Sequence, residues 1–89
     1  MAAEAIRAEQ ERRAREEQLR IDTLLSNARA RVEAEQIRAF VAAVEAKRDS
    51  LNLLTTEVEQ WVEWARSQAD RHDPLVGGKF LQRGDEAGQ

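Results

Sequence analysis

The sequence predicts an all-α protein: a long charged helix, then a shorter antiparallel helix, forming a helical hairpin that assembles into a coiled coil or helix bundle. Three observations favour this fold class. Charged residues make up 35% of the 89 residues and aromatic residues only 4%, a composition typical of long helices and coiled coils. The sole proline is Pro74, and no glycine precedes it. Apolar residues recur at helical spacing on both sides of one short turn-forming stretch.

Residues 1–20 are expected to form a charged helical extension. A glutamate stands four residues before an arginine at three places: Glu9 and Arg13, Glu11 and Arg15, and Glu16 and Arg20. This is the favourable order for ion pairs along a helix. Apolar residues are few and form no continuous stripe. We interpret the extension as a solvated spacer, with a weak coiled coil as the alternative.

Residues 21–75 are expected to form the hairpin. Its first helix begins with an amphipathic stripe: Ile21, Leu24, Leu25, Ala28 and Val32. A second stripe lies about 150° around the helix from the first: Ile37, Phe40, Val41 and Val44. The lack of proline and glycine favours one continuous helix over a break between the stripes. Small or apolar residues on nearly all sides of residues 39–46 indicate burial in a bundle of at least three helices, or four from two copies.

The first helix is expected to end near Arg48, and the second to start between residues 50 and 56. An early start would be capped at Asp49-Ser50. A later start would use Thr56, which forms a capping-box pattern with Glu59. Either connection is short, which predicts antiparallel helices.

The second helix carries one apolar stripe, expected to pack on the second stripe of the first helix: Leu54, Val58, Trp61, Val62, Ala65 and Ala69. Trp61 should therefore close the hairpin. Trp64 lies about 120° from Val58, so it either covers the flank of the bundle or joins an interface, where tryptophan is enriched.

Pro74 should end the second helix, because its ring disfavours helical geometry at the preceding residue. Residues 76–89 contain every glycine of the chain, and we expect a mostly disordered tail, above all at 83–89. The apolar residues that could pack against the end of the bundle are Leu75, Val76, Phe80 and Leu81.

The titratable residues form no catalytic or metal-binding motif. His72 is the only histidine, and there is no cysteine, so a zinc site and a Ser-His-Asp site both have little support. We interpret His72 as a last-turn residue that interacts with free carbonyls and the helix dipole. Asp70 and Asp73 are interpreted as part of a solvated face. We therefore expect no enzymatic activity and no cofactor.

The charge pattern argues against nucleic-acid and membrane partners. The net charge is −3, so no overall basic excess attracts polyanions. Basic residues between 29 and 48 alternate with Glu33, Glu35 and Glu45. No apolar run approaches the ~20 residues needed to span a bilayer, and the N-terminus lacks the apolar core of a signal peptide. With no cysteine either, we expect a cytoplasmic location.

Three segments, Gln36–Ala46, Trp61–Arg66 and Ala69–Leu75, resemble the C-terminal coiled-coil and helical-hairpin tail of a group of uncharacterised bacterial proteins. The resemblance covers roughly residues 20–75. In that group the N-terminal region resembles a helix-turn-helix, which is absent from this chain, so no DNA-binding role is carried over to any residue here. The resemblance implies an excised tail that serves oligomerisation or partner recruitment.

These observations predict a structural oligomerisation module that forms a homo-oligomer, with a dimer favoured. The alternative is an adaptor domain that binds a helix of another protein, and the second alternative is an accessory tail of a nucleic-acid-binding protein. The interface, with another copy or with a partner, is predicted at Ile21, Leu24, Leu25, Val32, Ile37, Phe40, Val41, Val44, Val58, Trp61 and Trp64.

Overall fold

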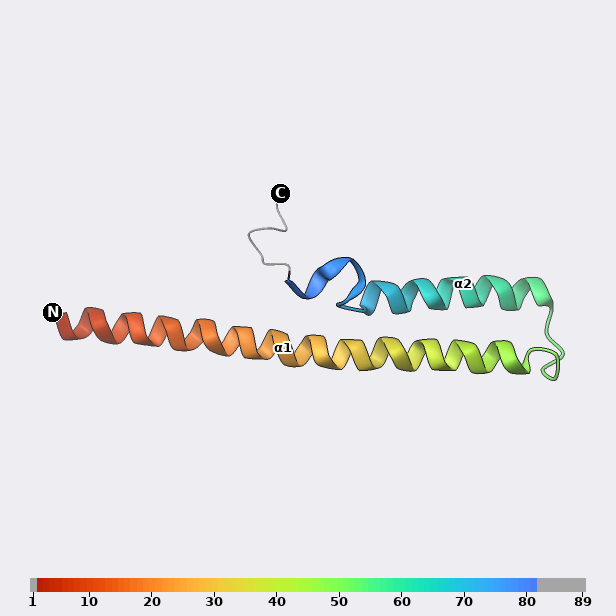
Figure 1. The fold of residues 1–89 in the computed structure, drawn as a ribbon, viewed down its shortest axis with the longest axis horizontal. Coiled ribbons are helices and arrows are strands. Elements are labelled where there is room, and N and C mark those ends of the chain that lie inside the picture. The colour runs from red at the N-terminus through yellow and green to blue at the C-terminus, as the bar shows by residue number, and fades with distance from the viewer. Residues whose placement is uncertain (1, 82–89) are drawn as a thin grey trace.

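The computed structural model describes residues 2–81, which form two α-helices and a short 3₁₀ segment. Helix α1 spans Ala2–Lys47, helix α2 spans Thr55–His72, and η1 spans Val76–Leu81. The two α-helices pack against each other, and α2 runs antiparallel along the C-terminal part of α1 (Figure 1). The predicted all-α helical hairpin is confirmed.

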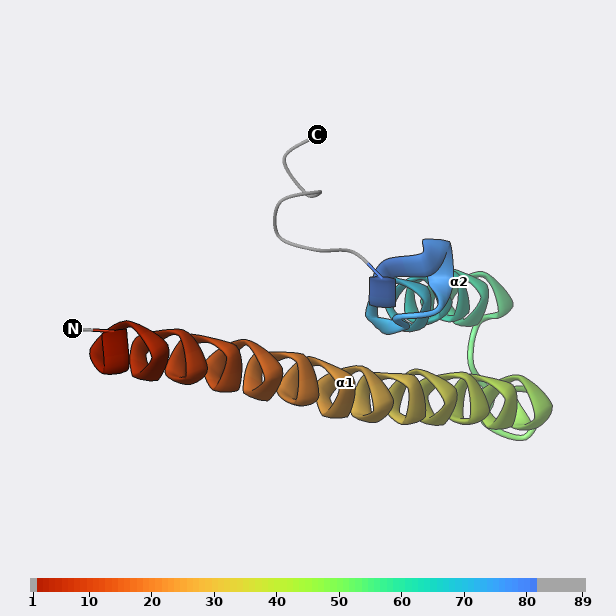
Figure 2. The ribbon, with the colours of Figure 1, turned by 60° about the vertical axis from the view of Figure 1, so that its left-hand side comes forward.

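Helix α1 is a single uninterrupted helix of 46 residues, as the lack of proline and glycine predicts. At 1.5 Å per residue it is about 69 Å long, and it sets the longest dimension of the molecule, 74 × 25 × 14 Å. The radius of gyration is 21.0 Å, whereas a compact chain of this length would have about 12 Å. Figure 2 shows the N-terminal part of α1 extending well past the end of α2.

The ion pairs of the extension differ in part from those predicted. Arg13 Nε lies 3.0 Å from Glu9 Oε1, as expected. Arg12, however, bridges Glu9 and Glu16, so Glu16 is not paired with the arginine at position 20. The other predicted pair, between positions 11 and 15, is likewise not formed in the described structure. Arg12 and Arg13 each have glutamates at helical spacing on both sides, and the spacing alone did not decide which pairs form.

The hydrophobic core is small and lies between α1 and α2. Val41 is fully buried and contacts the buried side chains of α2: Val58, Val62 and Ala65. Ile37, Val44 and Trp61 pack around this cluster while remaining partly exposed. The predicted contact between the second stripe of α1 and the stripe of α2 is therefore confirmed, except at Leu54, which is 66% exposed because it lies at the N-cap of α2. Ala34 and Ala69 are also fully buried.

The connection between the helices is a tight turn followed by an extended residue. The carbonyl of Lys47, where α1 ends, accepts bonds from the N–H and the hydroxyl of Ser50 at 3.0 and 2.8 Å. Asn52 adopts φ 58°, a left-handed conformation that asparagine tolerates. Helix α2 begins at Thr55, within the predicted range. The predicted capping box is wrong, because Leu54 is the N-cap residue and makes no side-chain cap bond.

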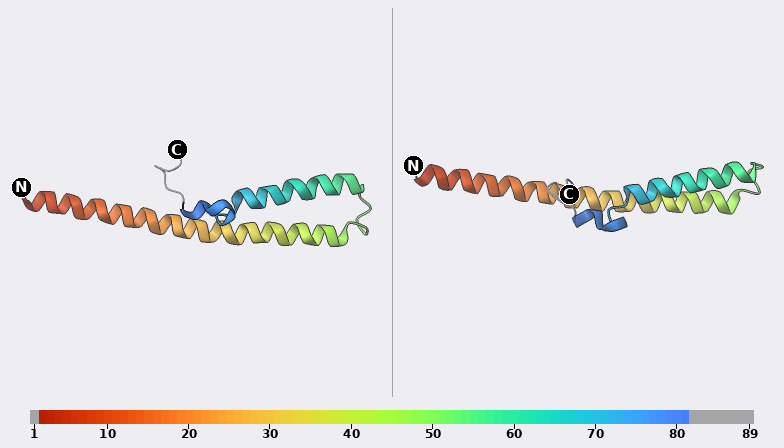
Figure 3. Two further views of the ribbon diagram at one scale, coloured as in Figure 1. Left: turned by 45° about the horizontal axis from the view of Figure 1, so that its top comes forward. Right: turned by 90° about the horizontal axis from the view of Figure 1, so that it is seen from above.

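Helix α2 ends before Pro74, as predicted. Asp73 has extended backbone angles, and its N–H donates to the carbonyl of Ala69 at 2.9 Å. The chain then forms η1, which continues past the end of α2 toward the N-terminal part of α1 (Figure 3). Residues 76–81 are thus ordered in 3₁₀ turns, while the disorder predicted for 83–89 falls outside the described residues.

The apolar side chains around η1 do not pack into the core as expected. Their exposed fractions range from 39% for Val76 to 70% for Leu81. Pro74 is the buried residue of this segment. Gly77 and Gly78 take φ values of 67° and 70°, and these two left-handed residues turn the chain away from the core.

Candidate interaction surfaces

The first candidate surface is the apolar stripe on the part of α1 that α2 does not cover. The end of α2 lies beside residues 31–33 of α1, because Asp73 contacts Arg31 and His72 contacts Glu33. Helix α1 projects beyond this point (Figure 1). Its stripe is open to solvent, with these exposed fractions: Ile21 40%, Leu24 66%, Leu25 52% and Val32 56%. An apolar surface of this kind is typical of an interaction site.

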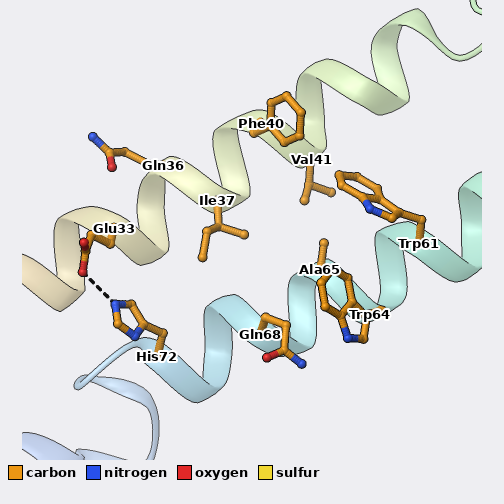
Figure 4. A pocket seen from close by; sticks show the side chains of 10 residues that line it. All are labelled: Glu33, Gln36, Ile37, Phe40, Val41, Trp61, Trp64, Ala65, Gln68 and His72. Atoms are coloured by element: carbon orange, nitrogen blue, oxygen red, sulfur yellow. Dashed lines mark hydrogen bonds and ion pairs between the residues drawn. The ribbon is translucent and has the colours of Figure 1, made fainter.

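The second candidate surface is a groove between α1 and α2, with a volume of about 670 Å³. Figure 4 shows its two sides: Glu33, Gln36, Ile37, Phe40 and Val41 from α1, and Trp61, Trp64, Ala65, Gln68 and His72 from α2. Aromatic and aliphatic side chains form its middle, and polar side chains line its edges. This is the composition that protein-binding grooves commonly have.

An aromatic contact between Phe40 and Trp61 lies at one end of the groove. The rings of Phe40 and Trp61 meet edge to face, with centroids 5.8 Å apart and an interplanar angle of 78°. Phe40 is nonetheless 61% exposed and Trp64 is 59% exposed. At the other end, His72 Nε2 lies 2.8 Å from Glu33 Oε1 (Figure 4). The groove therefore offers two large aromatic side chains that the hairpin itself does not bury.

The structure divides the predicted interface residues into two groups. Those inside the hairpin are either buried or partly covered by the partner helix: Ile37, Val41, Val44, Val58 and Trp61. Val41 and Val58 are 0% and 5% exposed, so they hold α1 and α2 together and are not available to another chain. The exposed group is Ile21, Leu24, Leu25, Val32, Phe40 and Trp64. Trp61 closes the hairpin as predicted, and Trp64 points away from its core.

A cluster around Asp73 ties the end of α2 to α1, and sequence reasoning missed it. Oδ2 of Asp73 accepts bonds from Arg31 and Arg38, both at 2.7 Å. Its other oxygen accepts the N–H of Leu75 at 3.0 Å. Arg38 also reaches Asp70 at 2.9 Å. The Asp73 side chain is only 2% exposed, so the interpretation of this carboxylate as part of a solvated face is wrong.

These contacts keep Asp73 ionised. The bond from the N–H of Leu75, followed by those from Arg38 and Arg31, lowers the pKa of Asp73 from its ordinary 3.8 to about 2, although burial acts in the opposite direction. The same contacts, first with Asp73 and then with Asp70, raise the pKa of Arg38. A signal was present in the sequence: Arg31 and Arg38 are seven residues apart, so they lie on one face of the helix.

Lys79 takes the role at the end of α2 that the sequence indicated for His72. The ring of His72 contacts Glu33 of α1 and does not cap the carbonyls of its own helix. Lys79 Nζ instead donates to the carbonyls of Asp70 and Arg71, at 3.2 and 2.7 Å. A cation therefore still faces the C-terminus of α2, and it comes from η1.

Three basic side chains of the hairpin, Arg31, Arg38 and Arg66, are paired with acidic side chains. Arg31 and Arg38 contact Glu35 and the aspartates at the end of α2, and Arg66 contacts Glu45. Over residues 2–81, neither helix carries an apolar stretch that could cross a bilayer. The same residues hold no group of three or more potential metal ligands.

Comparisons of the chain with protein-family models, with curated proteins and with solved structures give no match.

Proposed function

We propose that this chain is a structural self-association module that forms a dimer through the exposed apolar face of α1. The observation that carries the proposal is the open stripe on the projecting part of α1, where leucine side chains are more than half exposed. The hairpin cannot cover this stripe, because α2 ends beside residues 31–33.

The balance of forces supports association. The projecting part of α1 has strong helix formers and surface ion pairs, and each such pair contributes only about 0.2–0.5 kcal/mol. Burial of an apolar face contributes far more, roughly 25 cal/mol per Å² removed from water. A second copy of the chain carries the same stripe and can cover the first one, and two-fold dimers are the commonest soluble assemblies.

The measurement that tests this proposal is sedimentation velocity at two concentrations, with two matched variants. Leu25 in the stripe and Leu53 in the interhelical loop are both 52% exposed, so Leu25→Lys and Leu53→Lys make the same change at equal exposure. We expect the unmodified chain and Leu53→Lys to sediment as dimers, and Leu25→Lys as a monomer. An unmodified chain that stays monomeric at both concentrations would contradict the proposal.

A second function is favoured by the groove: an adaptor that receives an amphipathic helix of another protein. Phe40 and Trp64 are large side chains that remain about 60% exposed beside Ile37. Aromatic side chains in a hydrophobic groove are the usual anchoring points for a bound helix. The groove and the open stripe involve different residues, so one chain can carry both functions.

Tryptophan fluorescence separates the adaptor function from self-association. We expect an amphipathic helical peptide with aliphatic anchors to shift the emission of Trp64 to shorter wavelength. Trp64→Ala should abolish that binding while leaving the sedimentation of the chain unchanged. Leu25→Lys should abolish dimerisation while leaving peptide binding unchanged. If peptide binding persists in Trp64→Ala, the groove is not the site.

A further inference from the structure

The face of α1 opposite α2 carries a longer pattern than the apolar stripe alone. Its residues recur at alternating intervals of four and three: Ile21, Leu25, Ala28, Val32, Glu35, Ala39, Ala42 and Ala46. This is the a/d spacing of a coiled coil, and we call these residues the seam. All of them are exposed, and the only charged one is Glu35. The buried residues Ala34 and Val41 each lie two positions after a seam residue, roughly 160° around the helix.

The occupant of the seam can be argued from charge. In a parallel pair of α1 helices each seam residue meets itself, so Glu35 would face Glu35 of the partner subunit. The flanking residue Glu17 would face Asp22 of the partner subunit. Like charges at such positions destabilise the pair. A parallel arrangement therefore places like charges opposite each other both inside the seam and beside it.

An antiparallel pair avoids these repulsions in one register. When the centre of contact lies between residues 26 and 27, Val32 faces Ile21 of the partner subunit and Leu25 faces Ala28 of the partner subunit. Farther out, Ala39 faces Ala14 of the partner subunit. Glu35 then faces an uncharged residue, Gln18 of the partner subunit. The two-fold symmetry repeats every contact, so the same apolar layers occur on both sides of the centre, with the Glu35 and Gln18 layer between the outer two.

The flanking charges of this register are complementary. Arg29 faces Asp22 of the partner subunit. Glu17 faces Arg38 of the partner subunit, a side chain that also contacts Asp73, Asp70 and Glu35 within its own chain. Within residues 2–81, Arg29 and Glu17 belong to no ion pair, and Asp22 accepts only the Gln18 amide, at 2.9 Å.

Other registers bring like charges together. A shift by one heptad in one direction places Asp22 against Asp22 of the partner subunit. A shift in the other direction places Arg29 against Arg29 of the partner subunit. Only the central register combines apolar layers with attractive flanks.

We infer that α1 packs antiparallel on α1 of a second copy through the seam, with the two-fold axis between residues 26 and 27. The inference rests on the proposed self-association and adds its direction and register. Helix α2 does not obstruct this contact, since it covers the opposite face of α1. The dimer is a long central pair of α1 helices with one α2 on the outer side of each end.

Cross-linking tests the direction. The chain has no cysteine, so introduced thiols react alone. Ala14 and Ala39 are both exposed, which makes Ala14→Cys and Ala39→Cys mild changes. The two variants are mixed, left to exchange subunits, and treated with a short bismaleimide. We expect covalent dimers in the mixture and almost none in either variant alone, where like positions lie about 38 Å apart. Efficient cross-linking of a single variant overturns the antiparallel direction.

Charge substitutions test the register. Arg29→Asp places two aspartates opposite each other at both symmetric sites, so the dimer dissociation constant should rise roughly tenfold. Adding Asp22→Arg to this variant should bring it back to within about threefold. Arg20→Asp makes the same change at a position off the seam, where the arginine also has no ion pair within residues 2–81, and should have little effect. Equal effects of Arg29→Asp and Arg20→Asp overturn the register.

The outcomes separate the two levels of the argument. A chain that never dimerises contradicts the proposed function itself. A chain that dimerises but gives the wrong cross-links or no charge rescue contradicts only the antiparallel register.

Discussion

Residues 31–47 of α1 lie against α2, whereas residues 2–30 of the same helix extend past its end (Figure 1). The first region contains the two buried residues of α1, Ala34 and Val41. The second has no buried residue at all. Its polar contacts are short-range pairs such as those of Arg12 with Glu9 and Glu16.

The comparison shows that one continuous helix can be stabilised in two ways. Near α2, burial and the Asp73 cluster hold the helix through tertiary contacts. Beyond α2, helix propensity and local ion pairs act without tertiary support, and such helices are only marginally stable alone. Four predictions test this contrast, and each has a matched control or an internal comparison.

The largest effect is expected when the same substitution is made on the buried and on the exposed face of α1. Val41 is fully buried and Val32 is 56% exposed. Val41→Asp places an unpaired charge in the core, which costs several kcal/mol, and the packing of α2 on α1 should be lost at 25 °C. Val32→Asp should keep it. Near-ultraviolet circular dichroism of Trp61 at low protein concentration reports the packing. A native spectrum for Val41→Asp would disprove the role of this core.

A smaller but clear effect is expected at the end of α2. Asp73→Ala removes the acceptor of Arg31, Arg38 and the N–H of Leu75 together, and we expect Tm to fall by about 10 °C. Asp70→Ala is the control, because that carboxylate is 61% exposed and contacts Arg38 alone. Its Tm should fall by no more than about 3 °C. Thermal unfolding followed at 222 nm measures both, and equal shifts would refute the special position of Asp73.

Acid should weaken the same contact in a defined range. The pKa of Asp73 is about 2 in the folded chain and 3.8 ordinarily, so the ionised form is favoured by folding. Its stabilising contribution is complete above the ordinary pKa and is lost as pH falls from about 4 to about 2. We expect Tm to drop across this range in the unmodified chain and less steeply in Asp73→Asn. Parallel curves of Tm against pH for the two chains would contradict this assignment.

The smallest effect is expected in the projecting region. Contacts with Arg12 and Arg13 lower the pKa of Glu9, but all three side chains are on the surface. Glu9→Gln should reduce the amide protection of residues 5–16 by about twofold and leave the Tm of the hairpin unchanged. Hydrogen exchange followed by mass spectrometry measures both regions at once. A loss of protection in residues 55–72 would show that the two regions are coupled after all.

The sequence predicted well those features that depend on the spacing of apolar residues and on helix-breaking residues. The spacing of Ile37, Val41 and Val44 predicted the face of α1 that meets α2, and Pro74 predicted the end of α2. The continuity of α1 followed from its composition. These features depend on interactions between residues that are close together in the chain, and the sequence shows those residues directly.

Features that depend on tertiary geometry were harder to predict. The burial of Asp73 depends on where the end of α2 meets Arg31 and Arg38, and that meeting point is set by the whole length of the turn and helix. The side-chain cap expected at Thr56 failed because α2 starts two residues earlier than such a cap requires. Periodicity alone could not show which stripes α2 covers, so open and buried interface residues were predicted together.

The Asp73 cluster has a mechanical consequence. The core between the helices consists of valine and alanine, and small side chains of this kind resist sliding weakly. Both arginines reach the same oxygen of Asp73 from positions two turns apart on α1. A slip of α2 by one turn, about 5.4 Å, would carry the carboxylate away from at least one of these arginines. The contacts of Asp73 thus fix the position of α2 along the axis of α1.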